Sequence, residues 1–478
     1  MGSVFKLQAH NVHEIELQAR RLLFHVPSSA LFEADPLSAA VIAALRGRAP
    51  ASLAELQQEL GARFGSSEVA SALEELQDLD IVSDGAACRS TTQHARVSRI
   101  PLTTVVLNVN TGCNLSCTYC YKEDLSTPDK GEKMSLATAV QSIEMLLRES
   151  PAQERYNIVF FGGEPLTNLA LIREVVEFAE KRFAEIGKRV DFSLTTNATL
   201  LDEKTIAWLG AHRFGIAVSI DGPKAVHDRN RITVGGKGSY ETVARKVRLL
   251  LGSYRARPVG ARVTLTHGTT DVIGIWDHLF NELGFAEVGF APVTAGDIAD
   301  FNLDEHELAA VFADMKRLGE RYLEAALENR SIGFSNLHQL LTDIHEGTKK
   351  ALPCGAGYSM VAVDKNGGVN LCHRFTGSEL PTFGNVDSGL DREGLADFLG
   401  QRLDRGNTGC NTCRIRNLCS GGCYHESYQR YNDPAQPVYH YCDLLRDWVD
   451  FGLTVYTRIL AGNPGFFDTF LSPRRARQ

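Results

Sequence analysis

The sequence predicts an α/β protein built around a partial (β/α)6, TIM-like barrel. Between residues 96 and 345, six apolar strand candidates alternate with helical stretches, as in repeated βα units around a parallel sheet. Residues 1–95 carry a hairpin pattern and three short helices, and residues 346–445 hold seven of the eleven cysteines. A chain of 478 residues exceeds what one core usually serves, so we expect several domains.

The N-terminal segment is predicted to be a small separate module. Apolar residues alternate over two short stretches, which indicates a hairpin, and helical periodicity follows, with Ser52 and then Ser66 or Ser67 as helix N-caps. The two strands and three helices are expected at residues 15–17, 22–26, 37–45, 53–60 and 69–79. This combination predicts a winged-helix-like module.

Charge argues against nucleic acid as the partner of this module and of the whole chain. Residues 1–90 hold seven Lys and Arg against twelve Asp and Glu, a net charge of about −5, which disfavours a surface for duplex phosphates. The whole chain has a formal net charge of −8. The short basic end at Arg474, Arg475 and Arg477 is expected to be solvated.

The sequence also gives no sign of a membrane or secretory protein. No apolar run approaches the roughly 20 residues that span a bilayer, and residues 1–10 contain no apolar signal-peptide core. We therefore expect a cytoplasmic protein without a membrane partner. Eleven cysteines in a reducing compartment favour metal ligation over disulfides.

The barrel strands are expected where short apolar runs end in polar residues. In parallel barrels these carboxyl ends meet on one face, where active sites are built from loops. The six expected strands are residues 103–109, 157–161, 191–195, 215–220, 261–266 and 287–291, with a further helix at 444–460 and a loose end after Pro464.

Directly after the first strand lie Cys113, Cys117 and Cys120. Three thiolates within eight residues can wrap one side of a cubic iron-sulfur cluster but leave one of its four irons open. A zinc ion is the alternative, but three cysteines without a fourth ligand nearby make a poor structural zinc site.

This C-x3-C-x2-C spacing, with Tyr119 before the last cysteine, resembles the signature of the radical SAM enzymes. The resemblance implies that Cys113, Cys117 and Cys120 ligate a [4Fe-4S] cluster. It also implies that the open iron chelates the amino and carboxylate groups of S-adenosylmethionine, with Tyr119 beside the adenine.

Polar groups at the ends of the later strands extend this resemblance. Gly162 and Gly163 allow a close backbone approach to a ligand, and in the family this stretch holds the methionine amine of the cofactor. Short polar residues after the third and fourth strands could hold ribose hydroxyls, although Asn and Asp also form ordinary turns. A charge on the fifth strand needs a partner, and we expect the cofactor carboxylate. The expected cofactor contacts are Tyr119, Gly162, Gly163, Glu164, Pro165, Asn197, Ser219, Asp221 and Arg262.

A second group, His227, Asp228 and Arg231, could be taken for a general base. We favour a structural role, since in relatives this segment resembles a loop that shapes the substrate cleft.

The C-terminal cysteines resemble the SPASM domain, which in relatives carries two auxiliary iron-sulfur clusters. The resemblance implies one set, here called the outer set, of Cys410, Cys413, Cys419 and Cys442, and an inner set of Cys354, Cys372 and Cys423. Sulfatase-maturing relatives provide a further cysteine shortly after the first, whereas residues 356–361 contain none. The fourth inner position is therefore filled by a non-cysteine ligand or left open to a substrate thiolate. The remaining cysteine, Cys88, is expected to be a free thiol.

Module, barrel and cluster region together resemble radical SAM/SPASM enzymes that mature ribosomally made peptides, above all the branch that matures quinohemoprotein amine dehydrogenase. The resemblance implies thioether bonds between cysteine sulfur and a side-chain carbon of Asp or Glu. It also implies a precursor peptide bound through the N-terminal module and an electron donor such as flavodoxin or ferredoxin. The proton acceptor remains unidentified.

Three alternatives remain. Two are enzymatic: oxidation of a peptide Cys or Ser to formylglycine, as in anaerobic sulfatase maturation, and carbon-carbon crosslinking of a peptide. The third is a non-catalytic iron-sulfur electron carrier, which should not cleave S-adenosylmethionine.

Overall fold

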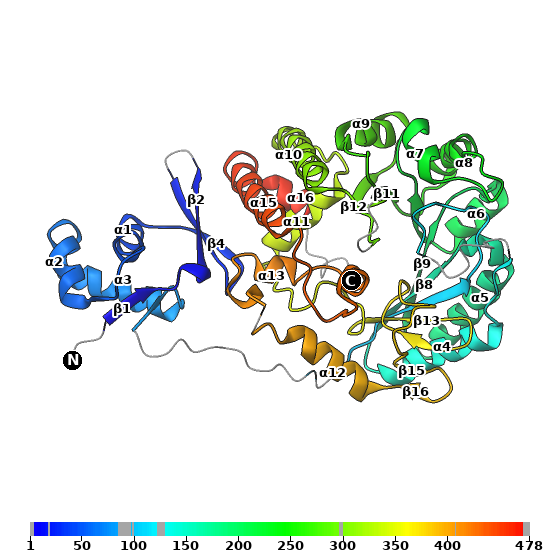
Figure 1. Ribbon diagram of the computed structural model, residues 1–478, viewed down its shortest axis with the longest axis horizontal. Helices are drawn as coiled ribbons and strands as arrows, with labels where there is room; N and C mark the ends of the chain where they lie inside the picture. Colours follow the sequence, from blue (N-terminus) through cyan, green and yellow to red (C-terminus); the bar gives the residue numbers. More distant parts are fainter. Residues whose placement is uncertain are drawn as a thin grey trace.

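A parallel sheet of six strands forms the wall of the barrel in the computed structural model (Figure 1). The structure describes residues 4–17, 20–84, 97, 100–121, 130–295, 300–406 and 408–471, so Cys88, the 95/96 boundary and the basic end at 474–477 lie outside it. The strands are β7 (Thr104–Asn110), β8 (Arg155–Gly162), β9 (Arg189–Thr196), β10 (Gly215–Ser219), β11 (Val259–Leu265) and β12 (Glu287–Pro292). They pair in chain order, which confirms the expected succession of βα units.

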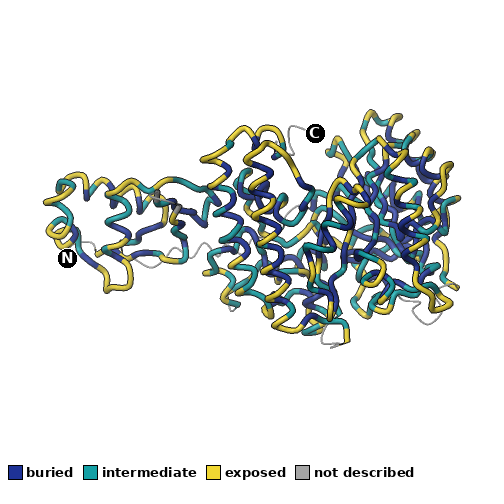
Figure 2. Tube along the Cα trace, turned by 90° about the horizontal axis from the view of Figure 1, so that it is seen from above, coloured by how far each residue is buried: buried dark blue, intermediate teal, exposed yellow. Residues whose placement is uncertain are grey.

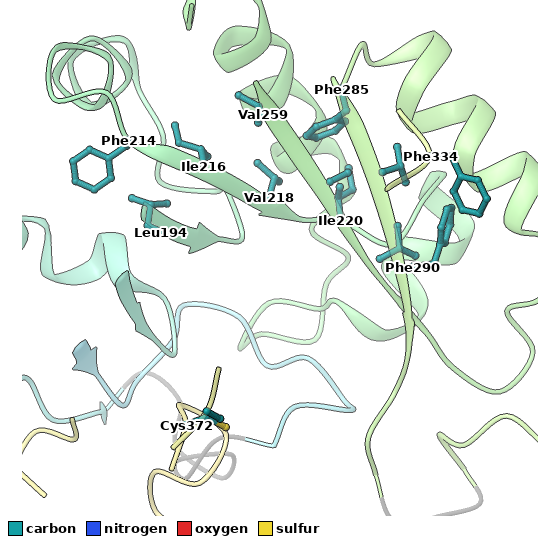
Figure 3. Close-up of a cluster of buried hydrophobic side chains, with 14 of the residues drawn as sticks. Leu194, Phe214, Ile216, Val218, Ile220, Val259, Phe285, Phe290, Phe334 and Cys372 are labelled. Carbon is teal, nitrogen blue, oxygen red and sulfur yellow. The ribbon is translucent and has the colours of Figure 1, made fainter. Parts of the chain in front are cut away.

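Helices cover the outer face of this sheet. The strands are linked by α4 (Leu136–Glu149), η3 (Pro165–Asn168), α5 (Leu169–Glu185), α6 (Glu203–Ala211), α7 (Lys224–Asn230), α8 (Tyr240–Ser253), α9 (Val272–Trp276) and η4 (Asp277–Glu282). Strands β8 and β10 alternate buried and half-buried residues, as expected of strands with one face toward helices. Ile216 and Val218 lie beside Val259 of the next strand in the resulting core, and Phe214 lies on the side of Leu194 (Figure 3).

The barrel sheet continues into the cysteine-rich region. Strand β13 (Met360–Val363) pairs in parallel with β7, and β14 (Val369–Asn370) pairs antiparallel with β13. The sheet therefore crosses the 345/346 boundary expected from the cysteine distribution. The boundary falls at the end of α11 (Ser335–His345), which follows α10 (Glu305–Leu327) and precedes the hairpin that extends the barrel.

The N-terminal residues form a lobe that projects from the barrel (Figure 2). Strands β2 (Val12–Leu17), β3 (Arg20–His25) and β4 (Ala30–Glu33) form an antiparallel sheet in that order, with Ile15 opposite Leu22. Three helices pack over a smaller sheet of order β5-β1-β6. Their bounds are α1 (Pro36–Leu45), α2 (Leu53–Phe64) and α3 (Ser66–Asp78), and the small strands are β1 (Val4–Leu7), β5 (Ala51–Ser52) and β6 (Val82–Ser83).

Capping explains two of these helix starts. Ser52 and Glu55 form a reciprocal capping box at the start of α2, as expected. The expected cap of α3 at Ser66 or Ser67 is wrong: both serines lie inside the helix and Gly65, with φ of 94°, occupies the cap position. Glycine suits this position because its φ falls in the left-handed region.

The lobe is fixed to the cysteine-rich region by polar contacts. Arg416 donates from Nη1 to the carbonyl of His10 at 2.9 Å and from Nη2 to Oδ1 of Asn11 at 2.7 Å. His13 lies 3.1 Å from the carboxylate of Asp450. Because Arg416 lies between Cys413 and Cys419 in the sequence, the lobe contacts the segment that carries part of the outer cysteine set.

The C-terminal part is helical to its described end. It comprises β15 (Gly384–Asn385), β16 (Gly389–Leu390), α12 (Arg392–Leu403), η5 (Cys410–Thr412), α13 (Arg416–Cys419), α14 (Tyr424–Tyr431), α15 (Cys442–Gly462) and α16 (Gly465–Phe470). The loose end expected after Pro464 is wrong for α16, since Phe466 is buried and packs edge-on against Tyr322. No helix in the described ranges is long and apolar enough to cross a membrane.

Candidate active site at the open end of the barrel

A cavity of about 390 Å³ lies at the carboxyl ends of the barrel strands. This is the face on which barrel enzymes build their active sites. Its lining combines the cysteine loop, strand ends and one segment of the cysteine-rich region. The residues used below are Cys113, Cys117, Tyr119, Cys120, Tyr121, Phe161, Gly162, Gly163, Glu164, Asn197, Ser219, Arg231, Arg262, Gly289, His373 and Arg374.

The loop that carries the three cysteines is held in shape by the segment after α7. The backbone N–H of Ser116 donates to the carbonyl of Ile232 at 2.8 Å, and that of Thr118 donates to Asn230 at 3.0 Å. The Thr118 hydroxyl also donates to Oδ1 of Asn230 at 2.7 Å. These bonds hold the segment on both sides of Cys117 against the barrel at the cavity.

The chemistry of these thiols fits a cluster better than a single ion. Burial raises the pKa of Cys113 to about 12 and that of Cys117 to about 11. The Cys113 sulfur nevertheless accepts hydrogen bonds from Leu115 N–H at 3.4 Å and from Asn197 Nδ2 at 3.7 Å, which favour a thiolate. Among the described residues no three His, Cys, Asp or Glu side chains converge on a single-ion site. A cluster accepts sulfurs that are farther apart, because each binds a different iron.

Gly162 and Gly163 are required by the chain itself. A Cβ on Gly162 would lie 2.2 Å from the carbonyl oxygen of Asn110, and one on Gly163 would lie 2.0 Å from that of Gly112. Gly163 N–H donates to Asn110 at 2.8 Å. We expected these glycines to let the backbone come close to a ligand. They also let it come close to the start of the cysteine loop.

Glu164 lies in the cavity wall with both carboxylate oxygens occupied. One oxygen accepts from the Thr196 hydroxyl at 2.7 Å and from Leu166 N–H at 3.1 Å, and the other accepts from Asn197 N–H at 2.7 Å. Burial raises its pKa to about 7 in spite of these bonds. Pro165 is buried at the start of η3.

Asp221 organises the adenine side of the expected site from behind the wall. Its Oδ2 accepts from the Tyr119 hydroxyl at 2.7 Å and from Arg231 Nε at 2.8 Å, and its Oδ1 accepts from Thr264 N–H at 3.0 Å. The Arg231 guanidinium lies 5.4 Å from the centre of the Tyr119 ring. Asp221 therefore lies behind the cavity wall with protein partners on both oxygens, and its expected contact with the cofactor stays a prediction.

His227 is a structural residue, as favoured from the sequence. Its Nδ1 accepts from Asp221 N–H at 3.4 Å, and its Nε2 lies 3.0 Å from the hydroxyl of Ser239, which donates to the carbonyl of Arg231. This pattern requires a neutral ring with the proton on Nε2. Burial accordingly lowers the pKa of His227 to about 4. His227 and Arg231 belong to one sequence group, but of the two only Arg231 lines the cavity.

Ser219 and Arg262 line the cavity from β10 and β11. The Arg262 side chain is exposed rather than buried within the apolar strand. Its charge therefore does not carry the free-energy cost of burial that led us to expect a partner. A Cβ on Gly289 would lie 2.7 Å from Arg262 Nη1, so this glycine leaves room for the guanidinium along the wall.

A second wall comes from the cysteine-rich region and was not expected from the sequence. His373 and Arg374 follow Cys372, and the His373 ring lies 4.1 Å from that of Phe161. Arg374 lies 4.7 Å from the Tyr121 ring centre and donates to the Thr294 hydroxyl. No motif marks these residues, because pairing of β13 with β7 carries them to the cavity.

The two C-terminal cysteine sets are each brought together. Burial above all, and then the neighbouring Cys423 and Cys354, raise the pKa of Cys372 to about 12. In the outer set, burial and then Cys419, Cys410 and Cys413 raise the pKa of Cys442. Backbone N–H groups two residues further along donate to the sulfurs of Cys354, Cys372 and Cys419, as at Cys113.

The comparison with known families decides the nature of the barrel. Residues 107–272, which contain the cysteine loop and the strand ends around the cavity, match the sequence profile of the radical SAM superfamily. The chain is a radical SAM enzyme. Enzymes of this superfamily use a [4Fe-4S] cluster and S-adenosylmethionine, as expected from the cysteine spacing. The expected barrel is confirmed, and the cysteine-rich region is consistent with a SPASM domain.

Curated relatives resemble this radical SAM enzyme over most of its length. The cysteine-type anaerobic sulfatase-maturating enzyme of Clostridium perfringens is 23% identical over 73% of this chain and 96% of its own. The radical SAM cyclopropyl synthase TigE of Paramaledivibacter caminithermalis is 24% identical over 73% of this chain and 75% of its own. These two similarities favour the alternatives of formylglycine formation and carbon-carbon bonding over the expected thioether chemistry.

Solved structures of the same fold extend to the N-terminal lobe. The structure of anSMEcpe with bound AdoMet has a TM-score of 0.65 at 21% identity and covers 76% of this chain and 100% of that one. Streptococcus suis SuiB bound to its precursor peptide SuiA has a TM-score of 0.51 at 15% identity and covers 92% and 99%. At these identities the similarities establish the fold alone.

Proposed function

We propose that this radical SAM enzyme modifies a polypeptide by joining a cysteine sulfur to a side-chain carbon of Asp or Glu in the same chain. The sequence resemblance to enzymes of quinohemoprotein amine dehydrogenase maturation suggests this reaction. One structural observation carries the choice: Cys372 directly precedes His373 and Arg374, which line the cavity, and residues 356–361 after Cys354 supply no further cysteine.

The proposed radical-generating site is the cysteine loop. Cys113, Cys117 and Cys120 would hold the cluster, and the cavity wall would hold S-adenosylmethionine, with Tyr119 beside the adenine and Arg262 toward the carboxylate. The bound pair supplies a carbon-centred radical that abstracts hydrogen from the substrate. Asp221 and Arg231 hold Tyr119 in place, and Glu164 and Asn197 hold the far wall.

The proposed sulfur site is the inner set. Tyr121 lies between the two sites: its pKa is raised by burial and further by Cys120 of the first set and by Cys372 and Cys423 of the inner set. His373 and Arg374 continue from Cys372 into the cavity. An inner cluster with one open iron would therefore hold a substrate thiolate next to the carbon that loses hydrogen. Formation of the carbon-sulfur bond would release one electron, for which the auxiliary clusters would be the acceptor, and the thiol proton would leave to solvent.

The precursor peptide would bind to the N-terminal lobe, which we take to be a winged-helix-like recognition module. Ala34 N–H donates to the carbonyl of Arg21, so the backbone groups of Ala34 and Phe32 face β3. Those of Leu31 face the other way, and among the described strands none pairs with that edge. An extended peptide can add to such an edge through main-chain hydrogen bonds.

Leu31 allows a matched test of this edge. Leu31→Pro removes an outward N–H without touching the bonds to β3, whereas Leu31→Ala shortens the same side chain and keeps the N–H. We expect Leu31→Pro to weaken precursor binding about tenfold relative to Leu31→Ala, on the order of 1.4 kcal/mol. Equal binding by both variants in a titration would exclude this edge.

The reaction itself is tested by mass spectrometry of a precursor co-expressed with the enzyme. Thioether formation removes two hydrogens per crosslink and blocks the cysteine against alkylation. Formylglycine formation is the second candidate, favoured by the similarity to sulfatase-maturating enzymes, and it replaces the sulfur by oxygen without a crosslink. A product that loses two hydrogens but keeps an alkylatable thiol would indicate carbon-carbon bonding or oxidation of a serine to formylglycine, and an aldehyde-reactive probe labels only the latter.

A further inference from the structure

Arg402 is a fully buried cation between the two C-terminal cysteine sets. It lies near the end of α12, its side chain is 1% exposed, and it is among the largest fully buried side chains of the described chain. A buried guanidinium normally has a carboxylate partner, because an uncompensated charge is costly in the interior. Among the described residues Arg402 has no ion pair.

Backbone carbonyls surround Arg402 instead. Its Nη2 donates to Gly422 at 2.8 Å and to Ser420 at 3.4 Å, and its Nη1 donates to Ala435 at 3.0 Å and Gln436 at 2.5 Å. The Nε group, although buried, has no hydrogen-bond partner. Carbonyl dipoles satisfy hydrogen bonds, but they do not neutralise a full charge.

The backbone is shaped for this contact. Ser420, Gly421 and Gly422 have φ values of 58°, 82° and 81°, three successive left-handed residues. A Cβ on Gly421 would lie 3.0 Å from Arg402 Nη2. These residues form the whole link between Cys419 of the outer set and Cys423 of the inner set. The three residues between the two cysteine sets therefore wrap around the guanidinium of Arg402.

Tyr424 extends the arrangement toward the inner set. Its ring lies 5.1 Å from the Arg402 guanidinium, its side chain is 1% exposed, and its buried hydroxyl has no hydrogen-bond partner. Negative charge at Cys354 and Cys423 acts on Tyr424, whereas Cys410 and Cys419 act on Arg402. Burial raises the pKa of Cys354 and Arg402 opposes this shift, so the unpaired cation acts on both cysteine sets, whereas the orphaned hydroxyl is near the inner set.

We propose that Arg402 and Tyr424 form a charge bridge between the two auxiliary clusters and raise their reduction potentials. The inference rests on the proposed binding of iron-sulfur clusters by these cysteines. A cluster with four thiolates is anionic and becomes more negative by one charge when it is reduced, so a nearby cation and a hydrogen-bond donor both favour the reduced form. The bridge would therefore help the clusters to accept the electron released when the carbon-sulfur bond forms.

The test compares Arg402→Lys with Arg402→Gln in the cluster-loaded enzyme. Both substitutions lose the planar fork that binds the carbonyls, but only the lysine keeps the charge. Redox titrations followed by electron paramagnetic resonance give the potential of each cluster. We expect Arg402→Gln to lower the auxiliary potentials, Arg402→Lys to stay nearer to wild type, and the radical SAM cluster to be unchanged in both.

Two further variants keep the test decisive. Arg392→Gln removes an arginine from the other end of α12, where it pairs with Glu149, and should change no potential. Tyr424→Phe removes only the hydroxyl and should lower the potential of the inner cluster alone. Equal auxiliary potentials in Arg402→Gln and Arg402→Lys would overturn the proposal. So would failure of both to bind auxiliary iron together with an unchanged potential in Tyr424→Phe.

Iron content separates this proposal from the function on which it rests. Wild-type enzyme must bind three clusters, and Cys419→Ala must remove the signal of one auxiliary cluster. If wild type binds a single cluster, the proposed ligand sets fail whatever Arg402 does. If three clusters are present and only the potentials fail to respond, the charge bridge alone is wrong.

Discussion

The cysteine loop of the barrel and the C-terminal cysteine sets present sulfur in two different ways. The loop has three cysteines within eight residues and is held by neutral hydrogen bonds to 230–232 and by an ion pair, Asp221 with Arg231, that is complete within the protein. The C-terminal sets extend from Cys354 to Cys442 and meet around Arg402, whose charge has no protein counterpart among the described residues.

The difference concerns what each site needs before it binds anything. A site with internally balanced charge can keep its shape when empty. A site built around an uncompensated buried cation is stabilised by the anionic group that it binds, so folding and loading are coupled there. We therefore expect the barrel site to be preorganised and the cysteine-rich region to depend on its clusters.

The strongest test of this comparison removes one cysteine from each region. We expect Cys113→Ala to abolish formation of 5'-deoxyadenosine while auxiliary iron remains. Cys419→Ala should leave cleavage of S-adenosylmethionine intact in the absence of peptide and lower the melting temperature of the C-terminal region. Iron analysis, product chromatography and thermal unfolding provide the measurements. Loss of cleavage in both variants would show that the regions are not independent.

The next effect concerns the ion pair behind Tyr119. Asp221→Asn leaves Arg231 buried without its counter-charge, a change that costs about 3–5 kcal/mol. Both S-adenosylmethionine affinity and its cleavage should fall, by about tenfold or more. Tyr119→Phe is the control, since it loses one hydrogen bond worth about 1 kcal/mol and keeps the ion pair. If the two variants behave alike in cofactor titrations, the hydroxyl rather than the ion pair is the important element.

A smaller effect is expected at the glycine beside the cysteine loop. The added Cβ in Gly163→Ala would lie 2.0 Å from the Gly112 oxygen and must displace the loop, at a cost of about 1–3 kcal/mol. Gly400→Ala is a matched control inside α12, because it meets nothing within 4 Å and should be neutral or stabilising by up to about 1 kcal/mol. Thermal unfolding and the iron occupancy of the barrel site report the difference. An unchanged Gly163→Ala variant would contradict the close packing.

The smallest effect is a pH dependence carried by His227. Because its pKa is lowered to about 4 in the fold, the unfolded chain binds more protons below pH 6.5. Its contribution to stability is complete above that pH and is lost as pH falls toward 4. Between pH 7.5 and 5.5 the loss amounts to about 1 kcal/mol. His227→Gln should be less stable at pH 7.5 but should show a flatter decline in denaturant unfolding. Parallel curves for both proteins would exclude this role.

The sequence predicts those parts of the molecule whose signals are local. All six barrel strands lie within a few residues of their expected positions, because each is a short apolar run that ends in a turn. The cysteine loop and the glycine pair are equally local. The sequence also distinguishes His227 from a general base, although through resemblance rather than through the hydrogen bonds that make its ring neutral.

The remaining features depend on contacts between distant segments. Arg374 reaches the cavity because β13 pairs with β7, some 250 residues earlier in the chain. Arg402 is one of many arginines in the sequence, and only its carbonyl partners at 420–422 and 435–436 set it apart. Asp221 was expected at the cofactor. Its hydrogen bonds to Tyr119 and Arg231 join separate segments, so a turn motif could not predict them. Helix α16 was missed because six residues give too short a periodic pattern.

Pairing of β13 with β7 also affects how enzymes of this kind can be recombined. Since Met360 lies opposite Thr104, the first barrel strand would have an unpaired apolar edge if the chain were cut near residue 345. A chimera that exchanges cluster regions between related enzymes therefore needs its junction after β14, so that the hairpin stays with its own barrel. A junction placed by the cysteine pattern alone should yield an aggregating product.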